Sequence, residues 1–219
     1  MVESQPASLL LVFALLAVLP LAFMALTAFV KISTVLQIVR GAIGAQHVPS
    51  STVILALSAA LTVIAMAPVG SRIWDRAAPL LDGKQDSADV ALGVVEAVRE
   101  PLRDFMRANA SERETHRFFE VARQARPAEE RDGVSRLDLV VLIPAFVVTE
   151  LMEAFALGFA LYLPFLVIDL VVSNVLVALG MLMVNPTQVS LPFKLLLFVA
   201  IDGWGLLAQS LVTGYRVGP

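Results

Sequence analysis

Cysteine is absent from this chain of 219 residues, and histidine occurs only twice. The first absence excludes disulfides, thiolate metal sites and cysteine nucleophiles. The two histidines, His47 and His116, are far apart in the sequence, and no His-Glu-x-x-His or Gly-x-Ser-x-Gly motif occurs. We therefore predict that the protein is not an enzyme, with no catalytic residue, no metal site and no cofactor.

Charge is also scarce, since 16% of the residues are charged and the formal net charge is −3. This balance gives none of the basic surface that nucleic acid requires, so nucleic acid is excluded as a partner. Residues 203–208 match the letters of a dinucleotide fingerprint, but no strand precedes them, and we treat the match as chance. Residues 1–6 lack the basic start of a secretory signal, which predicts that the apolar run after them is retained as a helix.

Apolar residues, in contrast, make up 58% of the chain, more than a soluble domain usually holds. We predict an all-α integral membrane protein. The first apolar run, residues 8–30, is uncharged and long enough to cross a hydrocarbon core of about 30 Å, with a kink at Pro20. The second run, residues 52–69, is expected to end at Pro68-Val69-Gly70 and to form a helical hairpin with the first.

Residues 71–136 interrupt the apolar sequence with thirteen acidic and twelve basic residues. Apolar residues recur at helical spacing from Val90 to Met106, which predicts a helical, water-facing domain with a kink or a restart at Pro101. Ser111 and Glu114 have the spacing of a capping box, which predicts the start of a second helix. Turn residues at 127 and 132–133 predict the return to the membrane.

The rest of the chain is organised around residues 137–184, an almost continuous apolar stretch that contains Pro144 and Pro164. Glu150 and Glu153 lie three positions apart on one helical face. They either line an aqueous path or form a solvated rim at the membrane edge, and both readings stay open. The small residues Ala154 and Gly158 are spaced for close helix packing, which favours packing between subunits over a ligand site.

Asp169 and Lys194 each lie among apolar residues. A charge in hydrocarbon costs several kcal/mol unless it is paired, so both side chains are predicted to be buried and to have partners. For Asp169 the candidate partners are Lys194 and Asn174, and we expect the bond to cross a subunit interface.

After a polar link at residues 187–192, a last apolar helix is expected over residues 193–212. The sequence thus divides into an apolar hairpin (1–70), a central water-facing helical domain (71–136) and an apolar C-terminal region (137–219). Whether Pro164 divides the long stretch decides between four and five apolar segments. Lys31, Arg40 and Lys194 place the short connectors in the cytoplasm by the positive-inside rule, so the central domain lies on the opposite side.

Three stretches resemble one family closely: 163–171 (LPFLVIDLV), 180–186 (GMLMVNP) and 190–198 (SLPFKLLLF) followed by Asp202-Gly203-Trp204. They are similar to the FliP/SctR (YscR/HrcR) family, which belongs to the type III secretion export apparatus. Residues 27–40, 66–68 and 101–106 agree with it, so the resemblance covers nearly the whole chain.

The resemblance implies a pore-forming subunit, expected as a pentamer, in the bacterial inner membrane, with much of the assembly drawn out of the bilayer plane toward the periplasm. The positive-inside argument puts the central domain on the periplasmic side. The resemblance also implies SctS-like, SctT-like and SctU-like partner subunits, and unfolded secreted proteins as substrates. The methionine gasket of the family falls on Met181, Leu182 and Met183, between Gly180 and Pro186, which is expected to end the helix. The missing signal peptide favours a virulence or symbiosis system over a flagellar export gate, which stays an alternative. A small-solute or proton transporter is the rival class, suggested by the intramembrane acids.

Overall fold

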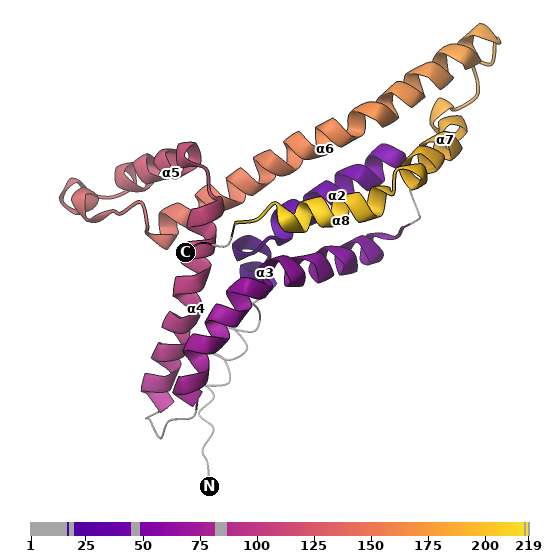
Figure 1. Ribbon diagram of the computed structural model, residues 1–219. Coiled ribbons are helices and arrows are strands. Elements are labelled where there is room, and N and C mark those ends of the chain that lie inside the picture. Colours follow the sequence, from indigo (N-terminus) through magenta and orange to yellow (C-terminus); the bar gives the residue numbers. More distant parts are fainter. Residues whose placement is uncertain (1–16, 18–19, 45–48, 82–86, 217, 219) are drawn as a thin grey trace.

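The computed structural model describes residues 17, 20–44, 49–81, 87–216 and 218. Within these residues the chain is helical and contains no strand, which confirms the all-α prediction (Figure 1). The elements, in chain order, are α2 (Phe29–Ile43), α3 (Ser51–Leu81), α4 (Ser87–Asn109), α5 (Glu112–Gln124), the 3₁₀ helix η1 (Ala128–Gly133), α6 (Leu139–Ala178), α7 (Pro186–Ala200) and α8 (Gly203–Thr213).

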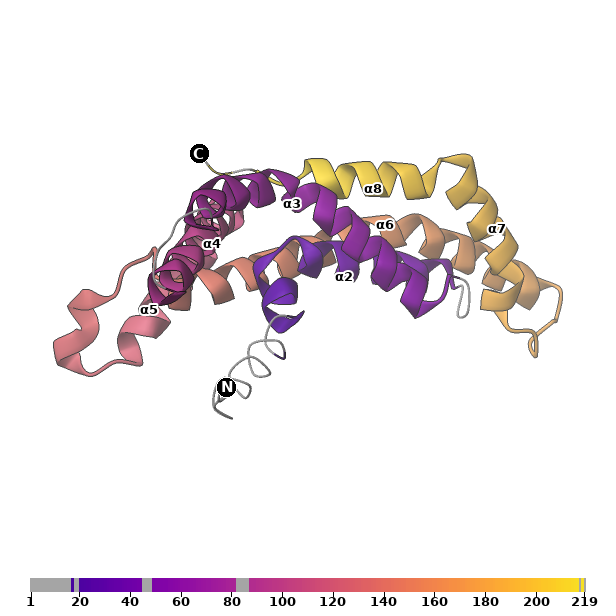
Figure 2. The same ribbon diagram turned by 90° about the horizontal axis from the view of Figure 1, so that it is seen from below.

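Helix α6 is a single helix of 40 residues, about 60 Å long at the usual rise per residue. Pro144 and Pro164 both lie inside it, so Pro164 does not divide the long apolar stretch. A proline removes one backbone donor but leaves the bonds on either side intact, and membrane helices tolerate it. Helices α2 and α8 lie along α6, which reaches past them to the α6–α7 connection (Figures 1 and 2).

Helix α2 forms the centre of the core and contacts α3, α6 and α7. Its residues Ile32, Val35, Leu36 and Val39 are each at most 1% exposed. A Cβ atom at Gly158 of α6 would come within 2.5 Å of Ile38, so only glycine permits this approach of α2. The close packing at Gly158 therefore joins two helices of the same chain, whereas the sequence favoured packing between subunits.

Helices α2 and α3 form a hairpin, but α2 begins at Phe29, where the predicted first run of residues 8–30 ends, so the predicted pairing of the first two apolar runs is not what the structure shows. Nearly half of the predicted first span lies outside the described residues, namely residues 8–16, 18 and 19. A short helix, Pro20–Leu26, precedes α2, and the chain bends by 82° between the two helices at Thr27–Ala28. The Thr27 hydroxyl donates to the Phe23 carbonyl at 2.6 Å and accepts from the Phe29 amide at 3.3 Å, so it closes one helix and opens the next.

The predicted end of the second run at Pro68-Val69-Gly70 is wrong. Helix α3 continues to Leu81 with Pro68 and Pro79 inside it, so it crosses the expected boundary between residues 70 and 71. Its first part packs against α2, and its continuation lies beside α4 (Figure 1). Packing against α4 gives the second half a partner, which the local sequence does not reveal.

The central segment is helical, as predicted. Helix α4 continues through Pro101 as one element, and α5 begins immediately after Ser111. The Ser111 side chain accepts a hydrogen bond from the Glu114 amide at 3.3 Å, so the N-cap is confirmed. The second half of the capping box is missing, because the Ser111 amide donates to Thr149 of α6 at 3.1 Å instead. This bond attaches the start of α5 to α6.

Two predictions for the C-terminal region are wrong: residues 187–192 are not a polar link, and residues 193–212 do not form a single helix. Asn185 caps α7 by accepting from the Thr187 amide at 3.0 Å, and Pro186 takes the first helical turn. The chain then bends by 58° between α7 and α8, where Asp202 adopts the left-handed conformation with φ 51°. A Cβ atom at Gly203 would lie 2.3 Å from the Phe198 ring, so glycine is required there.

Two helices, α3 and α6, are long and apolar enough to cross a membrane, and each bent helix pair could form one further span. In the most apolar window of α6 only 11% of the residues are buried within the chain. Such a large apolar surface must be covered by lipid or by other proteins. The chain is therefore a membrane protein.

Candidate functional site

The α6–α7 loop carries the predicted gate residues at the far end of α6 (Figure 1). Met183 is 100% exposed, Leu182 is 75% exposed and Met181 is 45% exposed, so the described chain leaves Met183 uncovered and covers about half of Met181. Three long apolar side chains at one exposed tip are costly in water. The loop is thus built to meet something outside this chain.

The loop is anchored to α6 by a Schellman motif around Gly180. The Met181 amide donates to the Leu176 carbonyl at 2.9 Å, and the Gly180 amide donates to the Val177 carbonyl at 3.0 Å. Gly180 has φ 74°, a conformation that side-chain-bearing residues rarely adopt. Pro186 was expected to end this helix, but Gly180 ends it and Pro186 begins the next.

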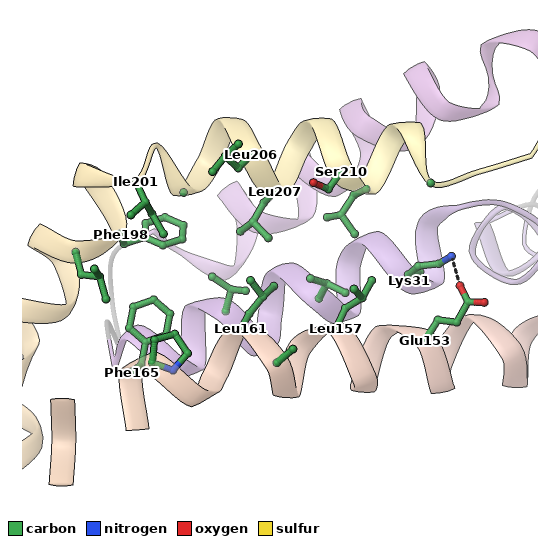
Figure 3. Close-up of a pocket in the computed structure, with 18 residues that line it drawn as sticks. Lys31, Glu153, Leu157, Leu161, Phe165, Phe198, Ile201, Leu206, Leu207 and Ser210 are labelled. Atoms are coloured by element: carbon green, nitrogen blue, oxygen red, sulfur yellow. Dashed lines mark hydrogen bonds and ion pairs between the residues drawn. The ribbon is translucent and has the colours of Figure 1, made fainter. Parts of the chain in front are cut away.

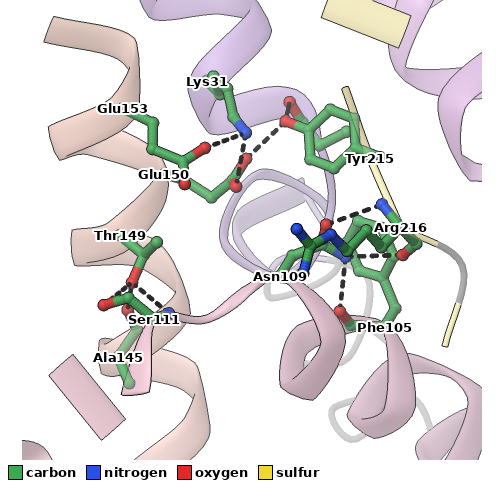
Figure 4. Close-up of polar contacts among 11 residues, drawn as sticks. Lys31, Phe105, Asn109, Ser111, Ala145, Thr149, Glu150, Glu153, Tyr215 and Arg216 are labelled. Atoms are coloured by element: carbon green, nitrogen blue, oxygen red, sulfur yellow. Dashed lines mark hydrogen bonds and ion pairs between the residues drawn. The ribbon is translucent and has the colours of Figure 1, made fainter. Parts of the chain in front are cut away.

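Glu150 and Glu153 are brought together by Lys31 of α2 (Figure 4). The Lys31 Nζ lies 2.6 Å from Glu153 Oε2 and 3.1 Å from Glu150 Oε1. Glu150 is fully buried, whereas 52% of the Glu153 side chain is exposed. Glu150 is therefore an internal partner of Lys31, and Glu153 is exposed. The sequence had suggested the same environment for both acids, either an aqueous path or a solvated rim.

Tyr215, just beyond α8, completes this cluster from the C-terminal end. Its hydroxyl donates to Glu150 Oε2, and the Lys31 ammonium lies 4.4 Å from the centre of its ring. Burial, and then the neighbouring Glu150 carboxylate, raise the pKa of Tyr215 above its usual range. The phenol therefore remains a hydrogen-bond donor.

Asp169 and Lys194 form the predicted pair, with Lys194 Nζ 2.6 Å from Asp169 Oδ2. The bond lies within one chain and joins α6 to α7, so the expected subunit interface is wrong for this contact. Lys194 is 2% exposed, as predicted, whereas the Asp169 side chain is 25% exposed and so only partly buried. Lys194 also donates to the Ala42 carbonyl at 3.1 Å, at the C-terminal end of α2. The Ser190 hydroxyl donates to Asp169 Oδ1. Lys194 thus ties three helices together where a helix end favours a positive charge.

Sequence reasoning missed Lys31, Tyr215 and Ser190 as members of these clusters. Lys31 was used only to orient the chain, although a single base in an apolar run is itself a sign of a buried partner. Tyr215 carries no such signal. Asn109 of α4 was missed as well: its side chain donates to the Arg216 carbonyl at 2.9 Å and accepts from the Arg216 amide at 3.0 Å. These two bonds hold the C-terminal segment against α4 (Figure 4).

The arrangement favours packing over chemistry. No group of three or more His, Asp or Glu side chains converges as a possible metal site within the described part of the chain. The acids of α6 are matched to lysines, and the exposed side chains of the α6–α7 loop are apolar except for Asn185. What remains available for function is an apolar loop at one end of a long helix.

Comparison with known proteins agrees with the motifs. The model of the FliP family matches residues 12–211. Pathogenicity-related ORF2 of Xanthomonas campestris pv. glycines is 44% identical over 95% of this chain and 96% of its own length. The hypersensitivity response secretion protein HrcR of Ralstonia nicotianae is 41% identical over 96% and 97% of the two chains. The Yop proteins translocation protein R of Yersinia pestis is 39% identical over 95% of each.

These relatives match along nearly their whole length, and the stretches first noticed in the sequence all fall within the family match. The chain therefore belongs to the FliP family of type III secretion export proteins.

Proposed function

We propose that this protein is a pore-forming subunit of the type III export apparatus, in which several copies surround one path for unfolded substrate proteins. The observation that carries the proposal is the α6–α7 loop, in which Met183 is fully exposed, Leu182 is mostly exposed and Met181 is about half exposed. Copies arranged around an axis would bring these side chains together. Each loop then contributes to a shared apolar ring.

Such a ring meets the physical demand on an idle export channel. A path wide enough for a polypeptide leaks ions unless it is closed, and an apolar constriction closes it by excluding water. Methionine is suited to this because its side chain is flexible and fits irregular surfaces. Opening breaks no hydrogen bond, so the ring can yield to a substrate and close again.

The remaining apolar surface supports assembly in a membrane. The exposed face of α6 offers a large area for neighbouring copies and for SctS-like, SctT-like and SctU-like subunits. We place the assembly in the bacterial inner membrane with α4 and α5 on the periplasmic side, because Arg40 in the last turn of α2 favours a cytoplasmic α2–α3 connector. The acids that suggested a transporter, Glu153 and Asp169 among them, are paired with lysines, which gives that rival no free acid in α6.

Conductance recordings on the assembled complex test the proposal. We expect simultaneous Met181→Ala, Leu182→Ala and Met183→Ala substitutions to raise the ion leak above the closed baseline while the complex still assembles. The matched control replaces Val121, Leu137 and Val140, which are similarly exposed at the opposite end of the molecule. A mutant complex that stays at the baseline would show that the seal lies elsewhere.

A further inference from the structure

The second half of α6 carries a regular stripe of exposed residues on the side that faces away from α7. Its members follow one another at intervals of four, three, four and three positions: Leu163, Val167, Leu170, Asn174 and Val177. The four apolar members are 44%, 57%, 55% and 59% exposed, and Asn174 is exposed as well. Alternating intervals of three and four are the spacing by which one helix packs along another. We call these five residues the α6 stripe.

The other sides of α6 are turned toward the chain itself. Phe165 and Leu176 are 4% and 7% exposed, and Asp169 between them is bonded to α7. Leu157, Leu161 and Phe165 line the groove that α6 forms with α8 (Figure 3). No member of the α6 stripe lines this groove, so the stripe is a separate surface.

Asn174 is the polar member of the α6 stripe. Its amide group is both a donor and an acceptor, and it makes no hydrogen bond within the described part of the chain. An amide enclosed by apolar groups is costly when it has no partner. Leu170 and Val177 lie one turn away on either side, so whatever covers the stripe must offer Asn174 a hydrogen bond. An alkyl chain cannot do this, whereas a neighbouring protein helix can.

Two features favour a second copy of this chain as that neighbour. The α6 stripe contains no charged residue, so copies placed side by side meet without repulsion there. The next position in the same series of intervals is Met181 of the α6–α7 loop. Copies whose Met181 side chains meet around one axis would therefore bring their α6 helices close together, and in this respect the inference rests on the function proposed above.

We propose that the α6 stripe packs against an adjacent copy and that Asn174 forms a hydrogen bond across this contact, which fixes the register of the copies. A single polar residue in an apolar helix contact adds little stability, but it penalises every arrangement that buries its amide without a partner. The apolar members, such as Leu170 and Val177, pack acceptably in several arrangements. Asn174 thus restricts the assembly to one number of copies.

Native mass spectrometry of the complex, purified with its copurifying subunits, counts the copies. We expect the unmodified complex to contain several copies of this chain in one fixed number. Asn174→Leu should assemble in undiminished yield but in more than one copy number, because it loses the preference of about tenfold that one hydrogen bond provides. Leu163→Met, a volume-conserving change on the same stripe, should keep the native number.

The copy numbers distinguish a failure of this inference from a failure of the proposed pore. A single copy in the unmodified complex would contradict both. Several copies in the unmodified complex, with an unchanged number in the Asn174→Leu variant, would overturn only the role of Asn174. A lower yield of that variant would overturn this role too, because Asn174 would then stabilise the complex instead of selecting its register.

A photoreactive residue at position 170 identifies the neighbour independently of the copy number. We expect an adduct with the mass of two copies of this chain, formed in membranes that contain the whole apparatus. Adducts only with a different subunit, or no protein adduct, would overturn the proposal, because the α6 stripe would then face another protein, lipid or water.

Discussion

Two lysines hold the acidic residues of α6 in place, and each comes from a different helix. Lys31 of α2 pairs with Glu150 and Glu153, and Lys194 of α7 pairs with Asp169. A buried ion pair adds little stability over apolar packing, but losing one partner leaves an uncompensated charge. The main effect of these pairs is therefore to specify which helices meet, and their contribution to stability is small. Removing one residue of a pair should destabilise the protein more than removing both residues.

At Asp169 this argument separates two substitutions. Asp169→Asn keeps an acceptor for the Ser190 hydroxyl and a polar partner for Lys194, whereas Asp169→Leu keeps neither. We expect the leucine variant to lose about 3 kcal/mol, the usual effect of breaking a buried pair, and the asparagine variant clearly less. Complex yields on native gels measure the difference. The double variant with Lys194→Met should recover part of the yield, and equal yields for asparagine and leucine would contradict the argument.

At the scale of elements, α5 is attached to α6 through its first residue. Ser111 caps α5 with its side chain, while its backbone amide donates to the Thr149 hydroxyl of α6. Glu114 is freed from the reciprocal capping bond, and its buried carboxylate accepts from Arg113 at 3.0 Å and Arg117 at 2.9 Å. The backbone amide of Ser111 therefore attaches the start of α5 to α6, while its side chain caps α5 locally.

Replacing Ser111 with alanine should cost about 1 kcal/mol, the usual effect of losing an N-cap, and leave secretion intact. The backbone bond to Thr149 survives in this variant, so the attachment to α6 remains. Thermal unfolding of the purified protein measures the cost, and a secretion assay measures the function. Normal accumulation with abolished secretion would show that Ser111 has a role beyond capping.

The sequence predicted α6 from its long apolar pattern and the start of α5 from the capping residue Ser111. The bends were not. Pro68 was expected to end a helix that α4 in fact supports, and Pro186 was expected to end a helix that it begins. Proline interrupts a helix on its N-terminal side and fits the first turn of the next, so the residue alone does not decide. The left-handed Asp202 at the α7–α8 bend gave no signal at all.

For the candidate site, the sequence predicted the Asp169–Lys194 pair but misplaced it between subunits. Asp169 and Lys194 are 25 positions apart in the sequence, and only the packing of α7 against α6 brings the two side chains together. Tyr215 and Lys31 lie near opposite ends of the sequence, and no local sequence pattern predicts a contact over such a separation. The exposure of Met181, Leu182 and Met183 is likewise a property of the folded chain, since apolar residues are ordinarily expected inside.

At the scale of the whole molecule, one end of α6 and the loop that follows it expose apolar side chains. The loop with Met183 is fully uncovered at its tip, and the apolar face of α6 leading to it is largely exposed. Closed rings form when the same two surfaces repeat around an axis, and a ring gives every copy the same environment. The proposed assembly would place the loops of neighbouring copies at the centre, where they cover one another.

The absence of cysteine makes this arrangement directly testable, because an introduced cysteine has no native thiol to compete with it. We expect Met183→Cys to form disulfide-linked dimers under mild oxidation in membranes that contain the whole apparatus. A disulfide requires Cα atoms within about 7 Å, a separation that only loops meeting at a narrow axis provide. One cysteine per chain limits the product to dimers. Val121→Cys on α5, which is 53% exposed, should stay monomeric as the control. Dimers from position 121 and none from position 183 would place the axis at the other end of the molecule, and the α6–α7 loops would not form the seal.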